Sequence, residues 1–250
     1  MELIVLGAGP AYSDRPGALG SAYLVRSTDG AIVLDLGQGT FTNLARAVEP
    51  SALEGVLVSH LHPDHFIDLV PLRHYLRWEF RPPRRVRLFA PAGIERRLDA
   101  LLDEPGFTSA CLELGALRPG ERRVGPFVVE AALVRHTAES YAFRVSLPDR
   151  TGPGLVYSGD CGDPDDLVPL VRAGDVLLVE ASFGPGPVPP GAEHLDGPMI
   201  GELAARTRPS RVLLTHLQMG FDETETVARV AERYPGPVSF VWPGDAVAID

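Results

Sequence analysis

Short apolar runs, many of them rich in β-branched residues, alternate along the chain with segments of helical periodicity. Such runs predict buried strands at Leu3–Leu6, Ala22–Val25, Ala31–Leu36, Gly55–Val58, Val86–Ala90, Val128–Val134, Tyr141–Leu147, Leu155–Tyr157, Asp175–Val179, Val212–Leu214 and Val238–Val241. The helical patterns predict helices at Thr40–Val48, Phe66–Leu76, Ile94–Leu102, Asp165–Val171, Met199–Ala205 and Thr224–Tyr234. The sequence Ser-Thr-Asp-Gly between the second and third runs predicts a hairpin turn. Strands punctuated by helices favour an α/β sandwich with sheets inside and helices outside.

The composition is that of a globular protein. The chain has 250 residues, of which 45% are hydrophobic and 22% are charged, and this excludes disordered and fibrous classes. No internal repeat or convincing linker divides the sequence, so we expect residues 1–250 to form a single domain. The apolar runs are only as long as strands, so we expect no membrane-spanning helix.

Charge and cysteine content narrow the partners and the compartment. The formal net charge is −10, and an acidic surface repels phosphate at long range, so general nucleic-acid binding is not expected. Cys111 and Cys161 cannot build a disulfide framework and fit a reducing cytoplasm. The opening sequence MELIVLGAG lacks the basic start and cleavage site of a secretory signal, so we expect a cytoplasmic protein.

The strongest chemical signal is the sequence Ser-His-Leu-His-Pro-Asp-His, which holds three of the seven histidines of the chain. His60 and His62 follow an apolar run, and residues two apart in extended backbone point to the same side. Pro63 disfavours helix at His62 and keeps that residue extended. A helical pattern then begins, which puts Asp64 and His65 in a bend at a helix start. Imidazole and carboxylate suit divalent zinc, iron or manganese, so this sequence predicts a metal site.

Further donors follow other predicted strands. His136, Asp160 and His216 each lie at or just past the carboxyl end of an expected strand. Strand ends at one edge of a sheet are where α/β folds assemble their sites. A lone residue of this kind is more often a cap or a surface group, but the repeated placement favours a shared site. Because one cluster cannot complete two metal shells, we expect these three side chains to supply the missing donors.

The chain resembles the metallo-β-lactamase fold superfamily over nearly its whole length. The sequence His-Leu-His-Pro-Asp-His at 60–65 matches the HxHxDH motif of that superfamily. The ribonuclease Z-like branch and related phosphodiesterases are similar in further segments: Leu6-Gly7-Ala8-Gly9, Asp35-Leu36-Gly37-Gln38-Gly39-Thr40, Ser140-Tyr141-Ala142-Phe143-Arg144, Glu180-Ala181-Ser182-Phe183, His194 and Leu214-Thr215-His216. The fold that this resemblance implies is the αββα sandwich, two mixed sheets flanked by helices, with metals at one edge.

The resemblance also implies a set of metal ligands. It divides them between two ions: His60, His62 and His136 for one, Asp64, His65 and His216 for the other, and Asp160 bridging both. Asp35 would orient a ligand imidazole through its far nitrogen, although it also fits a turn-capping residue. We expect two divalent ions, zinc first, with manganese or iron suited to the same ligands.

Such a metal pair implies a hydrolytic mechanism. Two cations would lower the pKa of bound water toward about 7, and the bridging hydroxide would attack a phosphorus or carbonyl centre. Asp64 could accept or orient the hydroxide proton. His194 would give a proton to the leaving alkoxide, with Glu180 orienting or charging its ring. Without the resemblance, His194 fits an exposed loop residue and Glu180 a surface carboxylate.

Three other features have both a structural and a functional interpretation. The Gly/Pro-rich stretch Gly184–Gly191 is either a surface connection or a rim over the site. Cys161 fits a packed small residue better than a reactive thiol. A basic cluster follows the first metal segment: Arg81, Arg84, Arg85 and Arg87. It could attract a phosphorylated substrate, but guarding an edge strand is favoured.

The preferred function is a dinuclear-metal hydrolase, a phosphodiesterase acting on a small or nucleotide-like phosphodiester. Processing of tRNA 3′ ends is a weaker expectation, because no long Gly/Pro arm lies between the first and third metal motifs. A lactone or thioester hydrolase stays open, since the same hydroxide attacks carbonyls. A di-iron redox protein would need a carboxylate in place of His62, and the complete donor set disfavours an inactive metal scaffold. A homodimer is left open.

Overall fold

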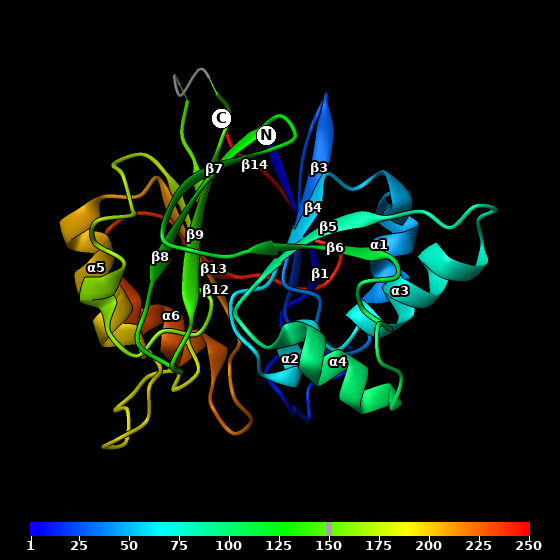
Figure 1. Ribbon diagram of the computed structural model, residues 1–250. Helices are drawn as coiled ribbons and strands as arrows, with labels where there is room; N and C mark the ends of the chain where they lie inside the picture. Colours follow the sequence, from blue (N-terminus) through cyan, green and yellow to red (C-terminus); the bar gives the residue numbers. More distant parts are fainter. Residues whose placement is uncertain (149–151) are drawn as a thin grey trace.

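Two seven-stranded sheets lie face to face in the computed structural model, which describes residues 1–148 and 152–250 (Figure 1). The first sheet has the spatial order β14 (Ala246–Ala248), β1 (Glu2–Gly7), β2 (Ala22–Ser27), β3 (Gly30–Leu34), β4 (Gly55–Leu57), β5 (Val86–Ala90) and β6 (Leu112–Ala116). The second has the order β13 (Val238–Phe240), β12 (Arg211–Thr215), β11 (Val176–Glu180), β10 (Leu155–Tyr157), β9 (Tyr141–Ser146), β8 (Phe127–Leu133) and β7 (Gly120–Val124). Both sheets contain parallel and antiparallel pairs.

Helices cover the two outer faces of the sheet pair (Figure 1). The helices beside the first sheet are α1 (Phe41–Ala47), α2 (Pro63–Phe66), α3 (Leu69–Trp78) and α4 (Ile94–Leu102). Those beside the second sheet are α5 (Gly197–Thr207) and α6 (Glu223–Ala231). Two short 3-10 helices, η1 (Pro50–Ala52) and η2 (Pro164–Asp166), complete the set. The predicted αββα sandwich is confirmed.

Three apolar layers explain why the strands read as nearly continuous hydrophobic runs. In β11, Leu178 packs in the layer between the sheets, while its neighbours Leu177 and Val179 pack under α5 and α6. In β2, Tyr23 faces the central layer and Leu24 faces the helices of the first sheet. Because such strands are covered on both faces, alternation between apolar and polar residues is absent.

The two predicted helices that contain an internal proline are not continuous. The expected helix Phe66–Leu76 is divided into α2 and α3, because Pro71 lacks the N–H that an unbroken helix would give to the Ile67 carbonyl. The backbone N–H of Asp68 bonds Leu36 O instead. The expected helix Asp165–Val171 is wrong: only η2 and a turn form there. Pro169 stops that helix, since its ring would clash with the carbonyl four residues earlier.

Three strands at the edges of the sheets were not predicted from the sequence pattern. β6, β7 and β14 were not predicted, because all three are short and partly exposed, and β6 and β7 also contain glycine and charged residues. Their presence changes the interpretation of the arginine cluster. β5 pairs with β4 on one side and with β6 on the other, so it is an inner strand and the cluster does not guard an edge. Arg85 and Arg87 instead form ion pairs with Glu113 and Glu54.

The strands that precede the expected site residues end at one end of the sandwich. β3 and β4 are parallel neighbours in the first sheet. β8, β10, β11 and β12 share one direction in the second, because β9 is antiparallel to both β8 and β10. This end is the lower one in Figure 1, where α2 lies. No helix within residues 1–148 and 152–250 is long and apolar enough to cross a membrane.

Candidate metal centre

Four donor atoms converge just past the ends of β4, β8 and β10. His60 Nε2 lies 3.0 Å from His62 Nδ1, which lies 3.1 Å from His136 Nε2. Asp160 Oδ2 lies 3.7 Å from His60 Nε2 and 3.6 Å from His136 Nε2. Within the described residues these four side chains form one group that could hold a metal ion.

A second group of donors lies beside the first. His216 Nε2 is 3.2 Å from Asp64 Oδ2 and 3.4 Å from His65 Nε2. Asp160 Oδ1 is 3.4 Å from His65 Nε2 and 3.6 Å from His216 Nε2. The two oxygens of Asp160 therefore face different groups, Oδ2 the first and Oδ1 the second. The sequence-predicted set of seven side chains is brought together in full.

The spacing and chemistry of these atoms fit cations. Zinc ligands lie about 2.0–2.1 Å from the ion, and tetrahedral arrangement puts neighbouring ligand atoms roughly 3.3 Å apart, close to the separations above. Asp160 Oδ1 is buried and has no hydrogen-bond partner in the described structure. An orphaned carboxylate oxygen among imidazole nitrogens is costly without a counter-charge. The residues present therefore fit two metal ions.

Protonation in the first group favours metal binding at neutral pH. Burial lowers the pKa of His60, His62 and His136, and His60 is affected most. These imidazoles are therefore neutral at pH 7, with a lone pair available for a cation. Burial opposes ionisation of Asp160, but His216 and His65 outweigh it and hold the pKa of Asp160 well below its usual range.

His65 behaves differently in the metal-free protein. Burial lowers its pKa, but the carboxylates of Asp160 and Asp35 outweigh burial and raise the pKa well above its usual value. His65 is then protonated at pH 7, so metal binding must displace its proton. We expect Zn²⁺ binding at pH 7 to release about one proton, with affinity rising about tenfold per pH unit while His65 stays protonated.

Isothermal titration calorimetry in two buffers of different ionisation enthalpy measures this release. The variant His65→Asn is the control, because it has no proton to lose at this position. Equal heats in the two buffers for the unsubstituted protein would contradict the assignment of His65 as a protonated ligand site.

Asp35 orients one histidine in each candidate donor group. Its Oδ2 accepts hydrogen bonds from His65 Nδ1 at 2.8 Å, the Tyr157 hydroxyl at 2.6 Å and the Ser59 hydroxyl at 2.7 Å. The Ser59 hydroxyl also lies 3.1 Å from His60 Nδ1. One buried carboxylate thus fixes an imidazole in each group and leaves their Nε2 atoms facing the metal centre. The alternative of a simple turn cap is not what the geometry shows.

Backbone conformation and close approach shape the site further. Asp35 and His216 both adopt left-handed backbone angles, with φ of 57° and 60°, which is uncommon for residues other than glycine. Gly37 lies against the peptide that follows Asp64: a Cβ added there would be 1.8 Å from Asp64 O. That carbonyl also accepts a hydrogen bond from Ser21 N at 2.9 Å. Only glycine leaves the Asp64 peptide in place.

The variant Gly37→Ala is expected to move the Asp64 peptide away from the metal centre. By analogy with residues that support metal ligands, metal affinity should fall about 10–100-fold, and stability should fall by about 1–3 kcal/mol through overpacking. Metal titration and thermal unfolding measure both. Gly152→Ala is the matched control, since nothing lies within 4 Å of its added Cβ. Unchanged metal affinity in Gly37→Ala would refute this role.

His194 and Glu180 form an acid pair beside both donor groups. His194 Nδ1 lies 2.9 Å from Glu180 Oε1 and 3.2 Å from the Ser182 hydroxyl. Burial lowers the pKa of His194, but the hydrogen bond and charge of Glu180 outweigh it and raise the pKa to about 9. His194 also forms a third possible donor group with Asp160 and His216, its Nδ1 lying 4.0 Å from Asp160 Oδ2. The bond to Glu180, however, commits that nitrogen to a proton. The arrangement suits a proton donor.

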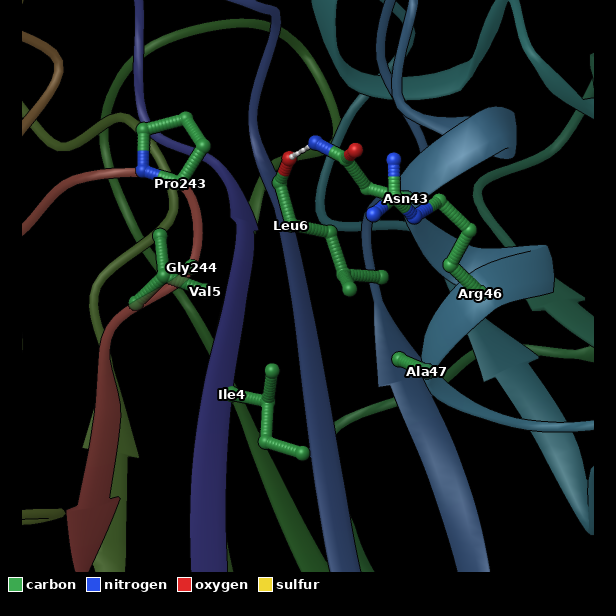
Figure 2. A pocket seen from close by; sticks show the side chains of 8 residues that line it. All are labelled: Ile4, Val5, Leu6, Asn43, Arg46, Ala47, Pro243 and Gly244. Carbon is green, nitrogen blue, oxygen red and sulfur yellow. Dashed lines mark hydrogen bonds between the residues drawn. The ribbon is translucent and has the colours of Figure 1, made fainter.

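A pocket of about 320 Å³ opens onto the donors. Its walls are lined by Pro10, Ala11, Tyr12, His62, Pro63, Asp64, Asp160, His194, His216 and Gln218. A separate pocket of about 330 Å³ lies between β1, α1 and the segment before β14, where Asn43 Nδ2 donates to Leu6 O (Figure 2). None of the residues lining it belongs to the metal-donor groups.

Several contacts of the site could not be expected from the sequence. Tyr157 ends an apolar run, and Ser182 lies in a family-like segment that assigns it no role, so their bonds to Asp35 and to the His194 and His216 rings are seen only in the structure. The Glu193 carbonyl accepts a bond from His136 Nδ1 at 2.8 Å. The Gly/Pro-rich stretch Gly184–Gly191 ends two residues before this contact, and none of its residues lines the pocket at the donors.

Two other expectations concern neighbours of the site. Cys161 is fully buried, and burial raises the pKa of its thiol, as a packed small residue requires and a reactive thiol does not. Arg81, Arg84 and Arg85 precede β5 at its amino end. Because β5 is parallel to β4, they lie at the end of the sheet opposite His60, so contact with a substrate at the donors is not supported.

Comparison with known proteins agrees with this geometry. Residues 32–217 match the family described as beta-lactamase superfamily domain. An uncharacterised protein of Mycobacterium leprae (strain TN) is 34% identical over 94% of this chain and 84% of its own length. The probable metallo-hydrolase YhfI of Bacillus subtilis (strain 168) is 27% identical over 98% of this chain and 100% of its own.

The fold and one further relative point the same way. The crystal structure of YhfI, a metallo-beta-lactamase fold protein, superposes with a TM-score of 0.85, covering 99% of each chain at 22% identity. Zinc phosphodiesterase ELAC protein 2 of Rattus norvegicus is 27% identical over 74% of this chain and 26% of its own length. Together with the two donor groups at one sandwich end, these matches show that the chain belongs to the beta-lactamase superfamily and is a metal-dependent hydrolase.

Proposed function

We propose that this protein is a dinuclear-metal phosphodiesterase that hydrolyses a small or nucleotide-like phosphodiester. The observation that carries the proposal is the placement of Asp160, whose two oxygens face separate groups of donors. A single metal would need only one of them. The name of the rat relative, a zinc phosphodiesterase, supports phosphorus as the attacked atom.

The residues divide the metal binding as follows. His60, His62, His136 and Asp160 Oδ2 would hold one ion, and Asp64, His65, His216 and Asp160 Oδ1 would hold the other. Two such ions, when bound, supply Lewis acidity that activates water at neutral pH and offsets charge on the attacked group. Zinc is proposed first, and manganese or iron suit the same donors.

The chain's own groups handle the protons. His216 is the main group that outweighs burial and lowers the pKa of Asp64, so Asp64 is a carboxylate at neutral pH and can accept a proton from the attacking water. His194, charged by Glu180, gives its proton to the leaving oxygen as the phosphorus–oxygen bond breaks. Proton acceptor and donor line the same pocket, as an in-line displacement requires.

The pocket size supports a small substrate. At about 320 Å³ it lies at the lower end of the roughly 300–1,000 Å³ range of ligand sites. The formal net charge of −10 gives no general attraction for RNA. A nucleotide-sized phosphodiester therefore fits better than a tRNA precursor.

A substrate comparison with the metal-loaded protein tests the proposal. We expect turnover of bis(p-nitrophenyl) phosphate that is lost with a chelator and restored by Zn²⁺ or Mn²⁺. A lactone and a tRNA precursor serve as competing substrates. His62→Ala should lose both metal and turnover, because His62 Nδ1 lies within 3.1 Å of two other donor atoms. Preference for the lactone, or turnover unchanged in His62→Ala, would overturn the proposal.

A further inference from the structure

The loop between β1 and β2 forms one wall of the metal-site pocket and is closed at its base. Gly9 N donates to Leu19 O at 2.6 Å. Gln38 Nε2 donates to Pro10 O at 3.3 Å. The backbone N–H of His216 donates to Ala8 O at 2.9 Å. The start of the loop is therefore tied to the segment that carries a metal donor.

Arg15 fastens a later part of the same loop to the segment that follows His216. Its guanidinium donates to the backbone carbonyls of Leu217 at 3.0 Å, Gln218 at 3.2 Å and Phe221 at 2.6 Å. It also lies 3.6 Å from the Glu223 carboxylate. The Arg15 side chain is only 17% exposed, so these bonds hold the loop and the segment after His216 in one arrangement. Arg15 does not itself line the pocket.

Tyr12 stands at the mouth of the pocket that this arrangement creates. The described chain exposes seven large hydrophobic side chains, and Tyr12, 67% exposed, is the one among them that lines this pocket. Its neighbours in the wall are Pro10, Ala11 and Pro63, which add apolar surface. Covering such a large exposed aromatic side chain with a flat ligand is favourable, because it removes apolar surface from water.

We propose that Tyr12 stacks on the nucleobase of a nucleotide phosphodiester and that Arg15 is the positioning residue that holds Tyr12 for this contact. The inference rests on the proposed phosphodiesterase function and narrows its substrate class. Stacking on an aromatic side chain tolerates any base, because every base has a π-face. Metal ions held by the donors would bind the phosphate, and Tyr12 selects esters that carry a heteroaromatic group.

Binding of two phosphate monoesters to the metal-loaded enzyme tests the contact. Adenosine monophosphate carries a base and ribose 5-phosphate does not, while both present the same sugar phosphate. We expect the unsubstituted protein to bind the nucleotide about tenfold more tightly. Tyr12→Ala should remove that preference by weakening the nucleotide alone, and Tyr12→Phe should keep it. Trp78→Ala, an aromatic residue 58% exposed outside the pocket, is the matched control and should keep it too.

The variant Arg15→Gln separates positioning from direct contact. A positioning role predicts that Arg15→Gln weakens the nucleotide but not ribose 5-phosphate, and that it adds nothing in a Tyr12→Ala background. Equal weakening of both ligands would mean that Arg15 binds phosphate, and would overturn the positioning role. Metal content of each variant shows that the site is intact.

The outcomes distinguish this inference from the function on which it rests. The stacking role is overturned if the unsubstituted protein binds the two monoesters equally, or if the preference for the nucleotide survives in Tyr12→Ala. In either case, turnover of bis(p-nitrophenyl) phosphate would still support the proposed phosphodiesterase function. Absence of that turnover overturns the proposed function first.

Discussion

Replacing Asp160 with asparagine is expected to lower turnover of a phosphodiester by roughly 10³-fold or more, because several kcal/mol of transition-state stabilisation depend on the metal pair. Asparagine has nearly the same shape, and Asp160 is 3% exposed, so the fold should persist. Its amide NH₂, however, would face one donor group with hydrogens in place of a lone pair. Bound metal should fall from two ions to one or fewer.

Metal content by mass spectrometry and turnover of bis(p-nitrophenyl) phosphate measure this effect. Asp29→Asn is the control, because Asp29 is exposed in the hairpin turn between β2 and β3 and faces no donor. Two retained ions with undiminished turnover in Asp160→Asn would show that the bridging position has been assigned to the wrong residue.

Replacing His194 with alanine is expected to act selectively on the leaving group. An alkoxide leaves only when protonated, whereas nitrophenolate leaves unaided. Loss of the donor should therefore slow an alkyl phosphodiester about 10²–10⁴-fold, with little change for the nitrophenyl ester. Paired kinetics on the two esters measure this ratio, and equal loss on both would contradict a proton-donor role.

The pH dependence of alkyl-ester turnover also tests whether His194 is the proton donor. The pKa of His194 is raised to about 9 in the metal-free protein, so the ring is protonated at neutral pH and loses its proton as pH rises. Turnover of the alkyl ester should therefore fall as pH rises through the pKa of His194. In the metal-loaded enzyme this fall should occur at a lower pH than the pKa of the metal-free protein indicates, because bound cations repel the imidazolium and lower its pKa. His194→Ala should lack this fall, and Glu180→Gln should move it to lower pH.

Much of this architecture could be predicted because strands that are buried on both faces consist of runs of consecutive apolar residues, which are visible in the sequence. The metal donors follow those runs directly, and His60, Asp160 and His216 could therefore be expected at one edge of the sandwich. The two predicted helices that are not continuous in the structure are those with an internal proline. Pro71 and Pro169 interrupt patterns that periodicity alone reads as continuous, because periodicity records which residues face the core and not which N–H groups are present.

The remaining part of the site depends on contacts between distant segments. Tyr157 reaches Asp35 across 122 positions of sequence, and Arg15 reaches Phe221 across 206. Neither side chain belongs to a local pattern that distinguishes it from an ordinary core tyrosine or a surface arginine. Edge strands such as β7 were missed for a related reason, since half-exposed strands rich in charge resemble loops until their partner is known.

Anomalous diffraction from crystals of the metal-loaded protein, measured at the absorption edge of the bound metal, tests the central claim most directly. We predict two peaks on opposite sides of the Asp160 carboxylate, one among His60, His62 and His136 and the other among Asp64, His65 and His216. A single peak, or a second peak remote from Asp160, would contradict the dinuclear centre on which the proposed hydrolysis depends.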